Sequence, residues 1–232
     1  MTDPVRPFAA LDDIVRKSRH LLVDFDGPVC DLWATHSVAL AADRLRKLLT
    51  DQRIQLPDLI ATTTDPLAVL DCAAAISPDL AATAEADLTD LELSAVPTAH
   101  PAGYANDVIT SARASGRTVT VIGFCSARAV NAYLVRSSLD EQVGLVVART
   151  THEPPSATSL VAHAITALRA DPAACILVAS SPATIEAASV AGMHTIGYAR
   201  TPADRGHLAD AHPGSTVAVS QNATIWMLWG AG

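Results

Sequence analysis

Six short runs of apolar residues are distributed along the chain, and stretches with helical periodicity bound them. Continuous apolar runs of this length are typical of strands that are buried on both faces of a parallel sheet. The runs cover residues 20–25, 118–124, 143–148, 174–180, 194–199 and 215–220. Strands that alternate with helices require right-handed crossovers, so the pattern predicts an α/β fold with a doubly wound parallel sheet.

Three of the intervening stretches carry clear helix signals. Residues 126–137 and 157–169 place apolar side chains at helical spacing on one face. Residues 182–191 begin with a proline, which suits the first turn of a helix, and end just before Gly192, a common stop signal. These stretches are expected to form the helices that cover the sheet.

The stretch from residue 32 to residue 98 differs, because one helical pattern follows another without a strand between them. A helical insertion after the first strand is expected to form a small cap over the carboxyl ends of the strands, where doubly wound sheets bind ligands. The chain therefore divides into a core of residues 1–31 and 99–232 and a cap of residues 32–98. Candidate pocket residues near the ends of the insertion are Trp33, His36 and Tyr104.

Composition and charge argue against a membrane protein, a secreted protein and a nucleic-acid-binding protein. The net charge is −8 and the acidic residues are spread along the chain, which disfavours nucleic acid and anionic membranes as partners. No apolar run reaches the roughly 20 residues of a membrane helix, and the first twenty residues lack the pattern of a secretory signal. We expect a cytoplasmic protein with a small-molecule partner, and the sequence makes no prediction of oligomeric state.

The strongest chemical signal is Asp24-Phe25-Asp26-Gly27, which ends the first predicted strand. Alternation along a strand puts Asp24 and Asp26 on the same side, so both carboxyl groups can reach one ligand. Two neighbouring acids suit acid/base or nucleophilic chemistry, because their environments can keep one ionised and the other protonated. Gly27 permits the tight turn that leads into the cap.

This motif, the helical insertion and the order of strands resemble the haloacid dehalogenase superfamily over nearly the whole chain. The resemblance implies that Asp24 is a nucleophile and that Asp26 is a general acid/base. It also implies a magnesium ion bound by Asp24, by the backbone carbonyl of Asp26 and by an acid from the last motif. The family's second, third and last motifs align with residues near 123, 149 and 180.

The second motif departs from the family pattern. Gly123 stands where the family has a serine or threonine that binds the phosphoryl group. Phe124 follows and is expected to form a wall of the pocket. Ser126 is a candidate phosphate ligand but is better placed to cap the following helix. Cys125 is a candidate nucleophile, because a helix N-terminus favours a thiolate.

The third and last motifs also depart from the pattern. The family's third motif is a lysine, and this chain has no lysine after Lys47. Arg149 and His152 occupy the corresponding stretch, where Arg149 is predicted either to bind an anionic group or to be a solvated loop residue. The two acidic positions of the last motif are held by Ser180 and Thr184. Magnesium prefers carboxylates, so it is expected to bind weakly if at all, and no other cofactor is expected.

Three functions remain open from the sequence. The favoured one is an enzyme in which Asp24 and Asp26 perform acid/base chemistry on a small organic molecule, without the magnesium-dependent machinery of phosphoryl transfer. The second is an inactive relative that binds a ligand or a protein. The third is a magnesium-dependent phosphatase or hydrolase with substitute ligands. The expected substrate-binding residues are Gly27, Gly123, Phe124, Arg149 and Ser180.

Overall fold

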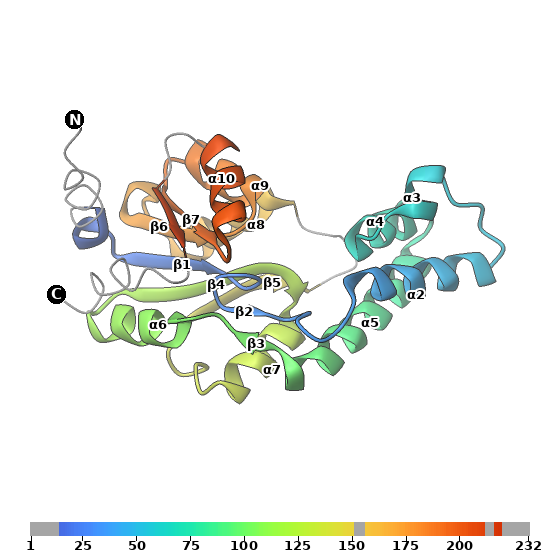
Figure 1. The fold of residues 1–232 in the computed structure, drawn as a ribbon, viewed down its shortest axis with the longest axis horizontal. Helices are drawn as coiled ribbons and strands as arrows, with labels where there is room; N and C mark the ends of the chain where they lie inside the picture. Colours follow the sequence, from blue (N-terminus) through green and yellow to red (C-terminus); the bar gives the residue numbers. More distant parts are fainter. Residues whose placement is uncertain (1–13, 151–155, 212–215, 220–232) are drawn as a thin grey trace.

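A computed structural model of the protein describes residues 14–150, 156–211 and 216–219 (Figure 1). Its centre is a six-stranded sheet with the order β5-β4-β1-β6-β7-β8, in which every neighbouring pair is parallel. The strands are β1 (His20–Asp24), β4 (Thr118–Ser126), β5 (Leu145–Arg149), β6 (Cys175–Ala179), β7 (His194–Ala199) and β8 (Thr216–Val219). All six predicted apolar runs form strands, so the predicted fold class is confirmed.

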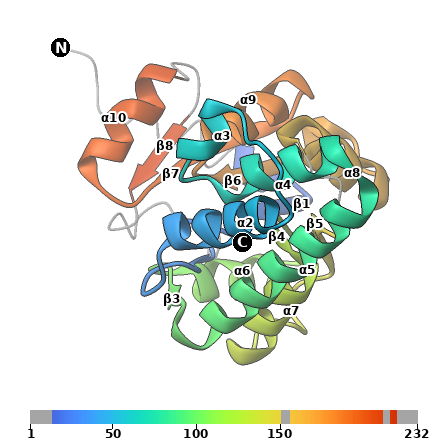
Figure 2. The ribbon, with the colours of Figure 1, turned by 90° about the vertical axis from the view of Figure 1, so that its right-hand side faces the viewer.

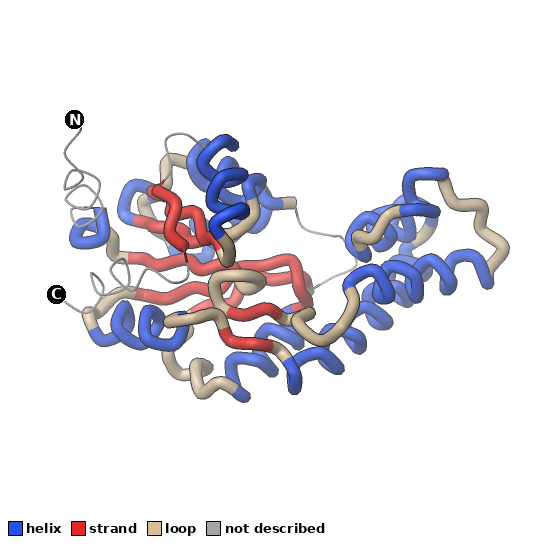
Figure 3. Tube along the Cα trace, viewed as in Figure 1, coloured by secondary structure: helices blue, strands red, loops and turns tan. Residues whose placement is uncertain are grey.

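Helices cover both faces of this sheet (Figure 3). They are α6 (Ala105–Ala114), α7 (Ala127–Arg136), α8 (Ala157–Leu168), α9 (Pro182–Val190) and α10 (Pro202–Ala211), with short 3₁₀ turns η1 (Val96–Thr98) and η2 (Pro172–Ala174). Alternation along β1 divides the core, because Leu21 and Val23 pack with α6 and α7 whereas Leu22 packs with α8 and α9. The predicted cap at Ser126 is also confirmed, since its hydroxyl accepts a hydrogen bond from the backbone N–H of Ala129.

The insertion after β1 is helical, as predicted. It consists of α2 (Val38–Asp51), α3 (Asp58–Thr62), α4 (Pro66–Ile76) and α5 (Pro78–Ala95). These helices have their own apolar cluster, formed mainly by leucine and alanine side chains of α2, α4 and α5. The cap extends from the carboxyl ends of the strands, and from that end its helices lie in front of the sheet (Figures 1 and 2).

Two very short strands join the cap to the core. β2 (Cys30–Asp31) pairs antiparallel with β3 (His100–Pro101), so the chain enters and leaves the cap side by side. The sequence pattern missed both, because two-residue strands carry no periodicity. Within the described part of the chain, none of the helices is long and apolar enough to cross a membrane.

Candidate active site

The topology of the sheet places two of the motifs beside each other. After β1 the main sheet continues at β4 on one side, and after β6 it continues at β7 on the other side. The crevice between the carboxyl ends of β1 and β6 is therefore the switch point where doubly wound sheets bind ligands. Asp24 is the last residue of β1, and Ser180 follows the last residue of β6.

A cavity of about 240 Å³ lies at this switch point, between the sheet and the cap. The sheet side of its wall is formed by Asp24, Asp26, Phe124, Cys125, Ser180 and Ser181. The cap and the segment that leads into it contribute Trp33, Val38, Asp65, Pro66, Leu67, Leu88 and Glu92. Both aspartates thus line one cavity, as predicted, although β1 ends at Asp24 and Asp26 lies just beyond the strand.

The environment of Asp24 favours its protonated form. Its side chain is only 4% exposed. Desolvation raises the pKa of Asp24 well above its usual value, and the nearby charge of Asp26 raises it further. A hydrogen bond from the backbone at Phe25 opposes these effects only in part. Asp24 is therefore suited to be a neutral acid.

The environment of Asp26 is more balanced. Its side chain reaches solvent. Desolvation by the surrounding protein raises the pKa of Asp26, but the positive charge of Arg200 opposes that shift, while the charge of Asp31 adds to it. Because the pKa of Asp24 is raised further, Asp26 is the carboxyl group that ionises first. The two environments thus separate an acid from a base.

Gly27 has an unusual backbone conformation and lies close to Ser180, a residue of the cavity wall. Its φ of +100° is a conformation that glycine adopts readily and other residues rarely do. A Cβ atom added at Gly27 would lie 2.6 Å from Oγ of Ser180. That hydroxyl donates a hydrogen bond of 3.0 Å to the backbone carbonyl of Asp26. Gly27 lines neither cavity, and its lack of a side chain lets Ser180 approach the loop that carries Asp26.

Replacing Gly27 by alanine is expected to lower the free energy of unfolding by about 2 kcal/mol through backbone strain, with a further loss from the contact with Ser180. Gly116→Ala is the matched control, because Gly116 also has a positive φ of +83° but no atom within 4 Å of its added Cβ. Urea unfolding of the two variants measures the difference. Equal losses would show that the approach of Ser180 does not constrain Gly27.

Arg149 does not face the cavity, contrary to its predicted role as a substrate ligand. It is the last residue of β5 and is 2% exposed, so the alternative prediction of a solvated loop residue is also wrong. Its Nη2 atom donates to both carboxylate oxygens of Glu92, at 2.9 and 3.0 Å. Its Nε atom lies 2.6 Å from Oε2 of Glu85. Arg149 thus pairs with carboxylates of the cap helix α5.

The second motif is arranged differently from its prediction. Phe124 lines the cavity, as expected, whereas Gly123 does not, and a Cβ added at Gly123 would lie 3.0 Å from Cβ of Phe25. Cys125 lines the cavity too, but burial raises the pKa of its thiol well above the usual value, so the proposed thiolate nucleophile is disfavoured. Residue His152 lies outside the described residues.

The donor atoms near Asp24 fit magnesium poorly. No group of three or more histidine, cysteine, aspartate or glutamate residues that could hold a metal occurs among the described residues. The carbonyl of Asp26 already accepts a hydrogen bond from Ser180. Thr184, at the second acidic position of the last motif, is buried in α9 and lines neither cavity. Magnesium is usually bound through one or two carboxylates and several waters in octahedral geometry, and here Ser180 and Thr184 of the last motif add no carboxylate to Asp24.

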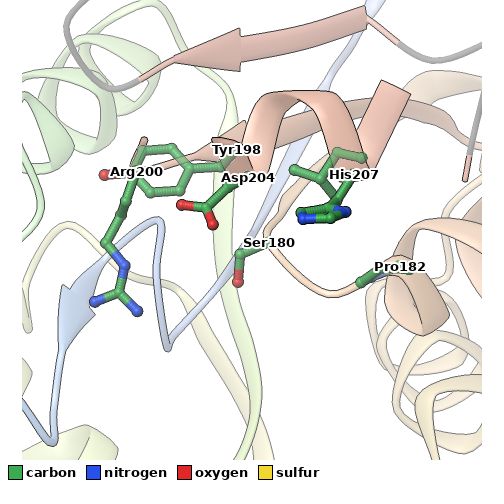
Figure 4. Close-up of a pocket in the computed structure, with 7 residues that line it drawn as sticks. Ser180, Pro182, Tyr198, Arg200, Asp204 and His207 are labelled. Atoms are coloured by element: carbon green, nitrogen blue, oxygen red, sulfur yellow. The ribbon is translucent and has the colours of Figure 1, made fainter. Parts of the chain in front are cut away.

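A second cavity, of about 270 Å³, adjoins the first at Ser180, which lines both. Its wall is formed by α10 and the ends of β6 and β7, and Ser180, Asp204 and His207 face its interior (Figure 4). The guanidinium of Arg200 extends toward β2, where it pairs with Asp31 (Figure 4). Of the two cavities, only the first is lined by Asp24 and Asp26, so it is the candidate active site.

Several wall residues were not predicted from the sequence. Glu92 is the most important, since it is 3% exposed and lines the cavity from the cap. The available signal was its helical spacing from Leu88 and Ala95, which puts a charged residue on the apolar face of the helix, where it requires a partner. Trp33 lines the cavity as predicted, whereas His36 and Tyr104 do not.

Solved structures with a similar fold include proteins named as hydrolases and a mutase. No family model matches the sequence, and no curated protein matches it either. A hydrolase of the haloacid dehalogenase-like family from Streptococcus pneumoniae is 12% identical, with a TM-score of 0.60 over 91% of this chain and 99% of that one. The β-phosphoglucomutase of Clostridium difficile is 13% identical, with a TM-score of 0.62 over 91% and 97% of the two chains.

A third structure, CbbY from Rhodobacter sphaeroides in complex with phosphate, is 16% identical, with a TM-score of 0.58 over 78% of this chain and 86% of that one. At such low identity the likeness establishes the fold and leaves the chemistry open. The cap and the core are both included, because the first two alignments span about nine-tenths of the chain. The chain therefore has the fold of the haloacid dehalogenase superfamily, and the resemblance that its sequence predicts is confirmed.

Proposed function

We propose that the protein is a hydrolase-like enzyme that performs acid/base chemistry on a small organic molecule, with Asp24 as the acid and Asp26 as the base. One observation carries this proposal: both aspartates line a single cavity that is otherwise walled largely by apolar side chains. Such a cavity binds the body of a small molecule and leaves a few polar groups to act on it. We expect this chemistry to proceed without magnesium.

The roles follow from the environments of the two carboxyl groups. Asp24 is buried and keeps its proton to a higher pH, so it is able to donate a proton to a substrate. Asp26 ionises first and is able to accept a proton from the same substrate. After one turnover the two protonation states are reversed, and exchange with solvent through the exposed Asp26 side chain restores them. Isomerisation, elimination and hydrolysis of a bond other than a phosphate ester all fit these roles.

Phosphoryl transfer fits the cavity less well. That reaction depends on positive groups that stabilise the charge on the phosphoryl oxygens. Among the described residues that line the cavity there is no lysine, arginine or histidine, whereas four carboxyl groups belong to it: Asp24, Asp26, Asp65 and Glu92. Asp24 is neutral in the proposed mechanism and Glu92 is paired with Arg149, but the ionised Asp26 would still repel an anionic substrate. The similar structures are named as hydrolases and a phosphoglucomutase, which supports an enzyme rather than an inactive binding protein.

A substrate panel tests this proposal. The purified protein is assayed against esters, amides, epoxides and isomerisable ketones, and against phosphate esters, each with EDTA and with added magnesium. We expect turnover of a substrate without phosphate at a rate that EDTA does not change. Hydrolysis of phosphate esters that requires magnesium would overturn the proposal. Binding of panel compounds without turnover, unchanged in Asp24→Ala and Asp26→Ala, would instead identify a binding protein.

A further inference from the structure

The carboxylate of Glu92 occupies a specific place in the cavity wall. Glu92 comes from the cap helix α5 and is almost completely buried. One carboxylate oxygen accepts a hydrogen bond of 2.7 Å from the backbone N–H of Ser126, and both oxygens accept from Nη2 of Arg149. The cap thus places a negative group against two donors that belong to the core.

These two donors are ones that bind anions in many proteins. Ser126 is the N-cap of α7, a helix of ten residues, and backbone N–H groups at such an end attract negative charge. The guanidinium of Arg149 is buried beside it, where a charged hydrogen bond is strong. Nη1 of Arg149 donates to the carbonyl of Phe124 at 3.1 Å, which fixes the orientation of the guanidinium. A carboxylate is already bound at this position, and it is supplied by the protein itself.

We propose that Glu92 determines the specificity of the cavity by filling the anion-binding position that Ser126 and Arg149 form, and so excludes substrates that carry a phosphate or a carboxylate. This inference rests on the proposed function, because it concerns the substrate class of the same cavity. With Glu92 in place, its carboxylate accepts the hydrogen bonds of Ser126 and Arg149 and balances the charge of the guanidinium. The cavity therefore presents acidic and apolar groups to a ligand and accepts neutral molecules.

Removing the Glu92 carboxylate tests the proposal. In Glu92→Ala the donors of Ser126 and Arg149 become accessible from the cavity, while Glu85 still pairs with Arg149 and limits the destabilisation. Calorimetry with sodium formate and with inorganic phosphate measures anion binding by the full chain. We expect formate to bind the variant about ten- to a hundredfold more tightly than the wild type, since charged hydrogen bonds contribute that much.

Glu92→Gln is the matched control, because its amide fills the same space and is expected to gain no formate binding. If Glu92→Ala is unfolded in buffer without anions, formate is expected to restore its circular dichroism and its thermal transition. Wild-type protein that binds phosphate in the cavity, or a Glu92→Ala variant that neither binds formate nor is restored by it, would overturn the proposal.

Anion binding does not depend on turnover, so the two proposals fail separately. If the wild type turns over no substrate in the presence of EDTA but Glu92→Ala binds formate, the acid/base function alone is rejected. If the wild type shows metal-independent turnover but Glu92→Ala does not bind formate, the role of Glu92 in specificity alone is rejected. Glu92 would then only join the cap to the core.

Discussion

Arg149→Met is expected to lower the free energy of unfolding by about 3–5 kcal/mol. The variant removes the positive charge that two buried or half-buried carboxylates share, those of Glu85 and Glu92. The Glu92 carboxylate is almost fully buried and also accepts a hydrogen bond from the backbone N–H of Ser126, so it cannot turn toward water without losing that bond. A buried charge without its partner retains its full desolvation penalty, so the loss exceeds that of an ordinary core substitution.

Arg44→Met is the matched control for this prediction. Arg44 also pairs with a carboxylate of α5, that of Asp87, but its side chain is 56% exposed. Exposed pairs contribute at most about 1 kcal/mol, so this variant is expected to change stability little. Urea unfolding at neutral pH, followed by circular dichroism, compares the two. A loss of less than about 1 kcal/mol in Arg149→Met would mean that the cap relaxes to hydrate both carboxylates.

A triple variant separates the charge effect from the loss of packing. In Arg149→Met with Glu85→Gln and Glu92→Gln, no buried charge is left unpaired. Replacement of a whole buried ion group is often close to neutral, so this variant is expected to recover most of the stability. No recovery would show that the shape of the arginine side chain, rather than its charge, joins the cap to the core.

The positions of the strands along the chain were predictable because parallel strands that are buried on both faces are nearly continuous apolar runs. The run at residues 174–180, for example, became the central strand β6, whose five residues are all buried. The helical insertion was predictable for a complementary reason, since its apolar residues recur at helical spacing and form a separate cluster within the cap. Local patterns thus define the elements and their order.

The partners of polar residues were not predictable in the same way. Arg149 and Glu92 are 57 residues apart in the sequence. No local pattern indicates that the arginine at the end of β5 pairs with a glutamate of α5. The same holds for the hydrogen bond from Ser180 to the carbonyl of Asp26, which spans 154 residues. Gly27 was correctly assigned to a turn by its sequence, but its second constraint, the approach of Ser180, depends on that distant contact.

Asp26→Asn is expected to lower turnover by at least about a hundredfold on any substrate that the wild type converts with EDTA present. The amide keeps the size of the side chain but cannot accept a proton at the pH of the assay. The wild-type rate is expected to rise with pH as Asp26 ionises and to fall at higher pH as Asp24 loses its proton. Since burial raises both pKa values, both limbs lie at higher pH than for exposed aspartates.

The two limbs of the pH profile assign the roles individually. Asp26→Asn is expected to remove the rising limb from the residual activity, and Asp24→Asn the falling limb. Asp107→Asn, an exposed acid in the first turn of α6, serves as the control and is expected to retain the full profile. If Asp26→Asn instead removed the falling limb, Asp26 would be the acid, and the order of the two pKa values that follows from their burial would be wrong. Full activity in both variants would mean that the carboxyl groups shape the cavity without transferring protons.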